Sequence, residues 1–261
     1  MKRAYADIPA GQMHYRFEGS GEPVLLLHPG VGSSDAFTKT MPYMSGRYLV
    51  IAPDFLGNGD SEPAPYQYTM LDHARSILGF MNSLGIKKAN VVGHHTGAKV
   101  AAEMAINAPE RVNKLVLSAI GYWEAAENIK KNEPDNFTGR VDIKPDGSHL
   151  MEWWRRAAMW GDPLDIIEAS VIEYIKAGPR GEEIHWTARA YDTKSRLPLI
   201  KCRTLVLSGA SGLFHSAAEN VRKLIPGSKL VVIENGTPRM ERTMPEEFAE
   251  GIINFLESTY K

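Results

Sequence analysis

Cysteine is nearly absent from this chain: Cys202 is the only one among 261 residues, so no disulfide can form within it. A chain without disulfides suits a reducing compartment, and we expect a cytoplasmic protein. The opening stretch lacks the apolar core of a secretory signal, and no apolar run is long enough for a membrane-spanning helix. We therefore expect no membrane partner.

An excess of charge of either sign is also missing. The formal net charge is −1, and both signs are interspersed along the chain, without a basic block or an acidic tail. This balance argues against nucleic acid as a partner. The spacings HExxH and CxxC, which mark common zinc sites, do not occur either. We expect no metal and no other cofactor, although a zinc site formed by His28, His94 and His95 stays open.

The chain does contain a regular alternation of short apolar runs and helical patterns. The runs predict strands at residues 11–19, 23–28, 48–54, 90–94, 113–120, 204–209 and 229–236. Helical periodicity predicts helices at residues 68–86, 98–109 and 245–259. Strands that alternate with helices indicate an α/β fold with a mostly parallel central sheet and helices on both faces.

The alternation stops between residues 121 and 199. This segment lacks clear strand patterns, is helical in patches, and contains all five tryptophans. We interpret it as a helical cap inserted between two strands of the sheet. The predicted organisation is a core formed by residues 1–120 and 200–261, with the cap at 121–199.

Several motifs follow one another in a characteristic order: LLLHPGVGSS, VIAPDFLGNGDS, VVGHHTG, PERVNKLVLS, TLVLSG and a final PEEF helix. This order resembles the α/β-hydrolase family over almost the whole chain, with the insert where that family carries its cap. GHHTG matches the family's strand–turn–helix elbow, which holds the nucleophile at its tip. The resemblance implies an α/β-hydrolase fold in which His95 occupies the nucleophile position.

The resemblance also implies an oxyanion hole formed by two backbone N–H groups. One belongs to Thr96, the residue after the elbow tip. The other belongs to Gly30 in the sequence His-Pro-Gly, because Pro29 has no N–H to donate. Two such donors stabilise negative charge that develops on a carbonyl oxygen.

The family's catalytic side chains are missing from the positions that the resemblance implies. His95 replaces the serine, Ser211 or Gly212 stands at the acid position, and Pro238 stands at or next to the histidine position. The family's usual mechanism needs a hydroxyl, an imidazole and a carboxylate. We therefore expect no ordinary serine-esterase mechanism. Thr96 has a hydroxyl, but its place in the elbow is that of the oxyanion amide.

His95 is the candidate catalytic residue. A helix N-terminus lowers the pKa of an imidazole, and a neutral imidazole is a competent general base. We predict that His95 acts as general base or acid while the Gly30 and Thr96 amides hold an enolate or oxyanion. Hydrolysis, C–C lyase chemistry, decarboxylation and isomerisation all fit this scheme. A nucleophilic His95 that forms an acyl-imidazole is a further alternative.

The predicted substrate pocket suits a small, mainly apolar carbonyl compound, because the cap is rich in aromatic residues. Its predicted lining is His28, Asp35, His94, Trp123, Trp153, Trp154 and His215. Asp35 either orients His95 or caps a helix, and Asp54 either lines the site or only forms a turn. A displaced partner for His95 is sought among His149, His185 and His215.

Two functions follow from these features. The first is an enzyme that performs cofactor-free, non-serine chemistry on a small carbonyl compound. The alternative is a catalytically silent small-molecule binder or an inactive hydrolase homologue. In both cases the expected partner is a small molecule, and whether the chain forms a homodimer stays open.

Overall fold

The structure is a computed structural model, and it describes residues 1–122 and 141–259. The described strands are β1 Lys2–Ile8, β2 Gly11–Glu18, β3 Glu22–Leu27, β4 Tyr48–Pro53, β5 Ala89–His94, β6 Val112–Ser118, β7 Arg203–Gly209 and β8 Lys229–Ile233. They form one sheet in the order β1-β2-β4-β3-β5-β6-β7-β8. Strands from β4 to β8 in this order pair in parallel, whereas β2 pairs antiparallel with β1 and β4. The predicted mostly parallel sheet is confirmed.

One strand, β1, lies outside the predicted set. It pairs with β2 in a continuous antiparallel register, and its inward residues include Ala6 and Ile8. Alanine contributes little to an alternating apolar pattern, so the strand has a weak signal in the sequence.

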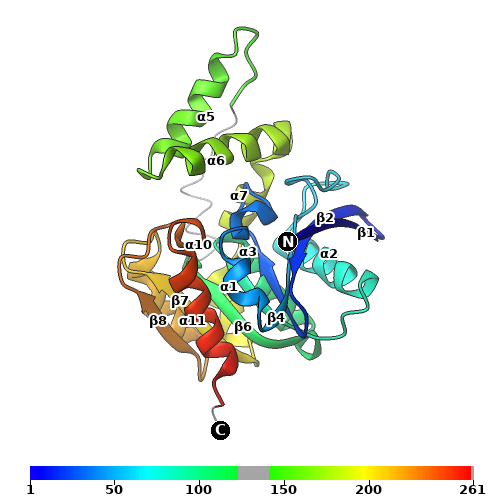
Figure 1. Cartoon of the computed structure of the whole chain (residues 1–261), viewed down its shortest axis with the longest axis vertical. Coiled ribbons are helices and arrows are strands. Elements are labelled where there is room, and N and C mark those ends of the chain that lie inside the picture. Colours follow the sequence, from blue (N-terminus) through cyan, green and yellow to red (C-terminus); the bar gives the residue numbers. More distant parts are fainter. Residues whose placement is uncertain (123–140, 260–261) are drawn as a thin grey trace.

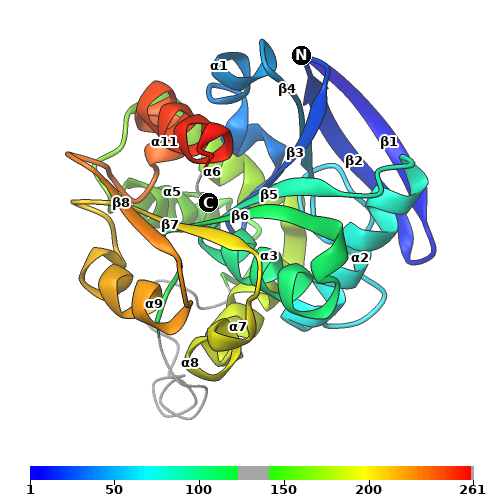
Figure 2. The same cartoon turned by 90° about the horizontal axis from the view of Figure 1, so that it is seen from below.

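Helices cover both faces of the sheet. Their bounds are α1 Met41–Ser45, α2 Met70–Ser83, α3 Thr96–Asn107, α5 Ser148–Ala158, α6 Leu164–Ala177, α7 Glu183–Ala190, α8 Thr193–Arg196, α9 Ala218–Leu224, α10 Met240–Thr243 and α11 Pro245–Glu257. Figure 2 shows α2, α3 and α9 on one face, with α1 and α11 on the other. A separate hydrophobic core lies on each face of the sheet. Adjacent residues of β3 point to opposite faces, so Leu27 packs in the core with α2 and α3, and Leu26 packs in the core with α1 and α11.

The segment between β6 and β7 divides into two parts. Helices α5 and α6 pack on each other and stand away from the sheet, at the top of Figure 1. Helices α7 and α8 pack instead against α3, next to the elbow. Among the described residues 141–199 there is no strand. The division into core and cap domains stays a prediction.

No helix in the described part of the chain combines the length and the apolar character that a membrane crossing requires.

Candidate active site

The elbow is a sharp turn between β5 and α3. β5 ends at His94 and α3 begins at Thr96, so His95 alone forms the turn. Its backbone has a φ of 50° and a ψ of −111°, a strained conformation for a residue with a side chain. Gly97 is required because a Cβ at this position would lie 2.1 Å from the Leu27 carbonyl oxygen. The sequence GHHTG therefore forms an elbow with His95 at its tip.

His95 lines a cavity of about 220 Å³. One side of this cavity consists of the loops that follow β3, β5, β6, β7 and β8. These loops meet because parallel strands place their carboxyl ends at the same edge of a sheet. The other side consists of residues from α5, α6 and α7. The cavity is thus located where a ligand site of an α/β protein is expected.

The hydrogen bond of His95 defines its tautomer. Nε2 lies 2.9 Å from the carbonyl oxygen of Pro238. A carbonyl oxygen only accepts, so Nε2 carries the proton and donates it. In the neutral ring the lone pair is then on Nδ1, which has no hydrogen-bond partner among the described residues. His95 therefore keeps one nitrogen available as a proton acceptor.

Burial of the ring, aided by the neighbouring His94, lowers the pKa of His95 to about 3. The predicted direction of the shift agrees with this value, but burial rather than the helix end is its main cause. The imidazole is neutral at every pH well above 3. It is a weak base in the free protein, and negative charge that forms beside it during a reaction strengthens it.

The two predicted oxyanion residues, Gly30 and Thr96, both line the cavity. Thr96 is the first residue of α3, so its N–H has no acceptor within the helix. A Cβ on Gly30 would lie 3.2 Å from Thr96 Oγ1 and 2.8 Å from Ile184 Cγ2. The loop and the elbow are therefore adjacent, and α7 closes over the loop so tightly that only glycine fits.

Among the candidates for a displaced histidine, His185 is the one that the structure brings to the cavity. Its Nε2 lies 2.5 Å from the Gly30 carbonyl oxygen, and its Nδ1 lies 2.9 Å from Glu182 Oε2. A carbonyl oxygen only accepts, so Nε2 of His185 donates to Gly30. His185 thus ties α7 to the loop after β3, and both of its ring nitrogens are engaged in these contacts. His149 and His215 do not belong to the described cavity lining.

The positions where the resemblance places the catalytic acid and the catalytic histidine differ in their access to the cavity. Ser211 and Gly212, after β7, are outside the described cavity lining. Pro238, after β8, lies in it, and its carbonyl oxygen accepts hydrogen bonds from Nε2 of His95 at 2.9 Å and of His94 at 3.2 Å. A backbone carbonyl thus contacts His95 from the position where the resemblance places a histidine.

His94 has the contacts that His95 lacks. Its Nδ1 lies 2.8 Å from Ser118 Oγ, and its Nε2 lies 3.0 Å from Glu241 Oε2. Nε2 therefore lies between the Glu241 carboxylate and the Pro238 carbonyl oxygen, which is 3.2 Å away. Burial opposes ionisation of Glu241, but its contact with His94 and the charge of Arg242 keep its pKa below the usual value.

Serine, histidine and carboxylate are therefore in contact as in a catalytic triad, but solvent does not reach them. Ser118 and His94 are 0% exposed, and neither belongs to the described cavity lining. A substrate in the cavity meets His95 first. The predicted place of His94 in the pocket lining is thus wrong, because His94 packs behind the elbow.

His28 and Asp35 are also absent from the described cavity lining. His28 is fully buried, where its Nδ1 donates to the Pro29 carbonyl oxygen at 2.7 Å and its Nε2 accepts from the Phe55 N–H at 2.9 Å. With both nitrogens occupied, it has no lone pair for a zinc ion. Asp35 pairs with Arg242 at 3.0 Å, and Ser33 rather than Asp35 caps the short helix there. Both residues brace the loop after β3.

The predicted aromatic lining is largely elsewhere. Trp153 stacks on Tyr174 with ring centroids 4.3 Å apart, and Trp154 is outside the described cavity lining as well. The tryptophan that does line the cavity is Trp160. Trp123 lies outside the described residues. His215 contacts Ser208 Oγ at 3.2 Å instead of reaching the cavity.

Asp54 braces two loops and does not line the cavity. Its carboxylate accepts hydrogen bonds from His14 Nδ1 at 2.8 Å, the Ser34 N–H at 2.7 Å and the Asp60 N–H at 2.9 Å. Burial opposes its ionisation, but these hydrogen bonds keep the pKa of Asp54 below the usual value.

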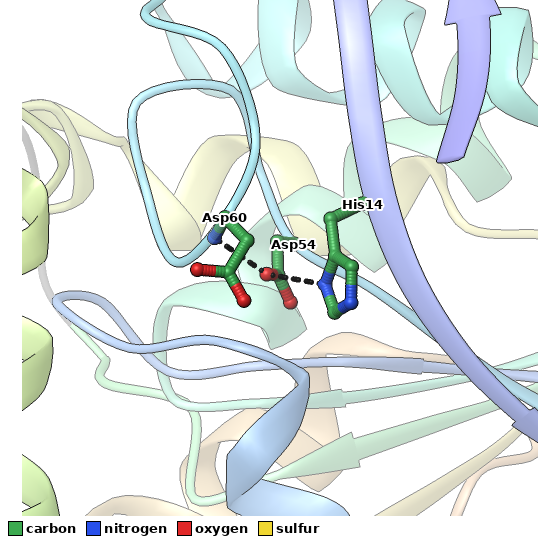
Figure 3. Close-up of side chains that lie close together, drawn as sticks. All are labelled: His14, Asp54 and Asp60. Carbon is green, nitrogen blue, oxygen red and sulfur yellow. Dashed lines mark hydrogen bonds and ion pairs between the residues drawn. The ribbon is translucent and has the colours of Figure 1, made fainter. Parts of the chain in front are cut away.

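Figure 3 shows His14, Asp54 and Asp60 together, the one group among the described residues whose ligand atoms are close enough for a metal ion. Since its central carboxylate is already hydrogen-bonded on both oxygens, we regard the group as a structural brace.

Two cavity residues have no signal in the sequence motifs. Glu173 on α6 accepts a hydrogen bond from Ser33 Oγ at 2.6 Å through Oε1, whereas its buried Oε2 has no partner among the described residues. Burial, with Asp54 and Asp35 nearby, raises the pKa of Glu173. Lys99 is buried in α3, and burial lowers its pKa well below the usual value. The sequence offered one indication that Lys99 lies near His95, because residues four positions apart at the start of a helix lie on the same side of it.

The predicted mainly apolar lining is incomplete. Charged side chains contribute much of the wall: Lys99, Arg156, Glu173, Arg189, Arg239, Glu241 and Arg242.

Comparisons with known proteins agree with this architecture. A putative carbamate hydrolase, RutD, from Caulobacter segnis is 29% identical over 91% of this chain and 92% of its own length. Haloalkane dehalogenase 2 from Mycobacterium bovis is 32% identical over 46% of this chain and 42% of its own. Among solved structures, the N-acyl homoserine lactonase AidH has a TM-score of 0.83 at 20% identity and covers both chains fully. The enol-lactonase of Burkholderia xenovorans LB400 has a TM-score of 0.79 at 18% identity, covering 98% of this chain and 100% of that one.

The similarity extends to a family model. The family described as alpha/beta hydrolase fold matches residues 22–158, more than half of the chain. This range includes the loop after β3, the elbow and β6. The mostly parallel sheet with helices on both faces agrees with the fold that the family description names. The chain therefore belongs to the α/β hydrolase fold family.

Proposed function

We propose that this protein is a hydrolase-like enzyme that converts a small carbonyl compound without a serine nucleophile and without a cofactor. His95 acts as the general base through Nδ1, and the Gly30 and Thr96 amides stabilise the oxyanion or enolate. The observation that carries the proposal is the single lone pair of His95, in a cavity that also contains both amide residues. The names of the relatives, which include hydrolases and lactonases, favour hydrolysis as the reaction.

The proposed reaction begins with proton transfer to His95 Nδ1 from water or from the carbon next to the carbonyl group. The oxygen that becomes negative is held by the two amides, which are worth about 3–4 kcal/mol each in other enzymes. As this charge develops, it favours the imidazolium form of His95. The ring can then return the proton to the leaving group, so His95 serves both as base and as acid.

Glu173 is the proposed second proton donor. Its Oε1 accepts a hydrogen bond from Ser33, and its buried Oε2, which has no partner among the described residues, is the oxygen that would carry the proton. A raised pKa keeps the carboxyl group protonated at a higher pH than usual. Two titratable groups with pKa values shifted apart are the usual basis for an acid and a base in one site.

The test is an activity screen over esters, lactones and β-dicarbonyl compounds, with the His95→Ala variant alongside. We expect turnover to fall about 10²- to 10⁴-fold in this variant, which is the usual contribution of a general base. His149→Ala is the matched control, since His149 is outside the described cavity lining. Equal turnover in His95→Ala and in the parent protein would remove His95 from the mechanism.

Two further variants separate the alternatives. His95→Ser should not create an esterase, because Pro238 supplies no imidazole to activate the serine. Glu173→Gln should lower kcat, and it should remove the loss of activity that occurs as the pH rises through the pKa of Glu173. If no substrate class is turned over but a ligand binds, the protein is the silent binder instead.

A further inference from the structure

The cavity wall carries more cations than carboxylates. The described lining includes the four arginines Arg156, Arg189, Arg239 and Arg242 against the two carboxyl groups of Glu173 and Glu241. Lys99 and His185 also line the cavity, but burial disfavours the charged form of Lys99. Three of the arginines pair with carboxylates outside the lining, Arg156 with Glu152, Arg239 with Asp162 and Arg242 with Asp35. The guanidinium groups that remain gathered at the cavity still repel one another in a poorly solvated space. An anionic ligand would offset this repulsion, so the wall favours a negatively charged molecule.

Two of the arginines form a pair on one side of the cavity. Arg239 immediately precedes α10 and Arg242 lies within it, three residues further on, and both line the cavity. Their side chains are only 20% and 12% exposed. Buried guanidinium groups are costly unless they are paired, which makes their position beside a cavity informative.

Each arginine is anchored through part of its guanidinium group. Arg239 Nε lies 3.3 Å from Asp162 Oδ2, and its Nη1 donates to Ser170 Oγ at 2.5 Å. Arg242 Nη1 lies 3.0 Å from Asp35 Oδ2. In both residues Nη2 has no partner among the described residues. The anchors thus hold two guanidinium groups in place while each retains N–H donors.

The pair adjoins, along the chain, the residue that contacts the proposed base. Arg239 directly follows Pro238, whose carbonyl oxygen accepts the His95 hydrogen bond. A group bound by the arginines therefore sits beside His95, with the Gly30 and Thr96 amides on another part of the same wall. A molecule with an anionic end and a carbonyl group fits this layout.

We propose that the substrate carries a carboxylate group, and that Arg239 and Arg242 bind this carboxylate while the carbonyl group faces the Gly30 and Thr96 amides. The proposal deepens the function proposed above and rests on it for the placement of the carbonyl group. The planar guanidinium matches a carboxylate with two parallel hydrogen bonds, which an ammonium group cannot do. The apolar residues of the wall, such as Trp160 and Phe214, hold the rest of the molecule.

The test compares two probes of similar size, the charged 4-oxopentanoate and its uncharged methyl ester. Binding is measured by isothermal titration calorimetry on the full chain at low and at high salt. We expect the acid to bind about 10-fold or more tightly than the ester, and its affinity to fall as salt is added. Equal binding of the two probes, or no binding of the acid, overturns the proposal.

Variants then locate the carboxylate. Arg239→Gln and Arg242→Gln should each weaken binding of the acid about 10- to 100-fold and leave binding of the ester unchanged. Arg222→Gln is the matched control, since Arg222 pairs with Glu219 on the surface of α9. Arg239→Lys keeps the charge and should restore only part of the affinity, and circular dichroism checks that each variant is folded. A loss that occurs only in Arg189→Gln overturns the assignment to the α10 pair.

The two proposals can fail separately. Binding does not require turnover, so His95→Ala should keep its preference for the acid over the ester. If this preference holds but no carbonyl compound is turned over, the carboxylate site stands and the proposed enzyme function fails. If His95-dependent turnover is confined to uncharged substrates and is insensitive to Arg239, the enzyme function stands and the carboxylate site fails.

Discussion

His94 and His95 are neighbours in the sequence, but their surroundings are opposite. His94 contacts Ser118 and lies next to Glu241, so it has the partners of a catalytic histidine, but it is 0% exposed. His95 has a carbonyl oxygen as its one hydrogen-bond partner among the described residues, and it lines the cavity. A triad-like set of residues is therefore no evidence of catalysis unless a substrate can reach it. His95 is the candidate catalytic residue because the elbow places it in the cavity wall, where a substrate can reach it.

The largest expected effect concerns the buried side of this comparison. Glu241→Ala should lower the free energy of unfolding by about 3–5 kcal/mol, because it leaves His94 buried without its carboxylate. Urea unfolding followed by circular dichroism measures the change. Glu219→Ala, which breaks an exposed pair with Arg222, is the control and should cost less than about 1 kcal/mol. A similar small loss in Glu241→Ala would mean that the buried pair is not structural.

The next effect concerns His95, the histidine that lines the cavity, and the way in which it makes stability depend on pH. The folded protein keeps His95 neutral down to a pH of about 3, whereas the unfolded chain protonates it near 6.5, the ordinary pKa of a histidine. The unfolded state therefore binds more protons in this window, and stability falls as the pH decreases from 6.5 towards 3. His95→Gln should reduce this slope by up to about 1 kcal/mol per pH unit. Unfolding curves at several pH values test this, and identical slopes for both proteins would contradict the low pKa.

Gly30→Ala tests how tightly the accessible site is built. The new Cβ would meet Ile184 Cγ2 at 2.8 Å, so we expect a loss of about 1–3 kcal/mol in the free energy of unfolding. Turnover should fall as well, because the loop must shift away from Thr96. Gly46→Ala is the control, since no atom lies within 4 Å of its added Cβ and its φ is −69°. If both variants melt at the same temperature, the contact with α7 is not close.

The smallest effect is expected for Ser118→Ala. Removing this hydroxyl takes one hydrogen bond from His94 and should cost about 1 kcal/mol of stability. Turnover should stay within about twofold of the parent value, because the serine is not accessible. A loss of turnover as large as that in His95→Ala would instead make the buried serine the nucleophile and reverse the comparison.

Much of the architecture could be predicted because its signals are local. Apolar runs such as Val24–Leu27 mark buried parallel strands, and the glycine of the elbow at position 97 is required by the nearby Leu27 carbonyl oxygen. The predicted lining by His28, Asp35 and His94 was wrong for a different reason. Polar residues near a site in the sequence were assigned to the cavity, but their hydrogen bonds turn them towards the loops that they hold.

Glu173, Arg239 and Arg242 could not be found from the motifs, because they come from segments that only folding brings to the elbow. Glu173 is 78 residues beyond His95 on α6, and its importance lies in a buried oxygen without a partner. Its pKa depends on the surroundings, which a linear pattern does not describe.

By itself the sequence determined the α/β order of strands and helices and the elbow with His95 at its tip. These features depend on residue type and short spacing. The tertiary structure alone decided which histidine faces the cavity, which nitrogen of His95 keeps a lone pair, and how charged the cavity is. These properties depend on burial and on partners that are distant in the chain, so they exist only once the chain has folded.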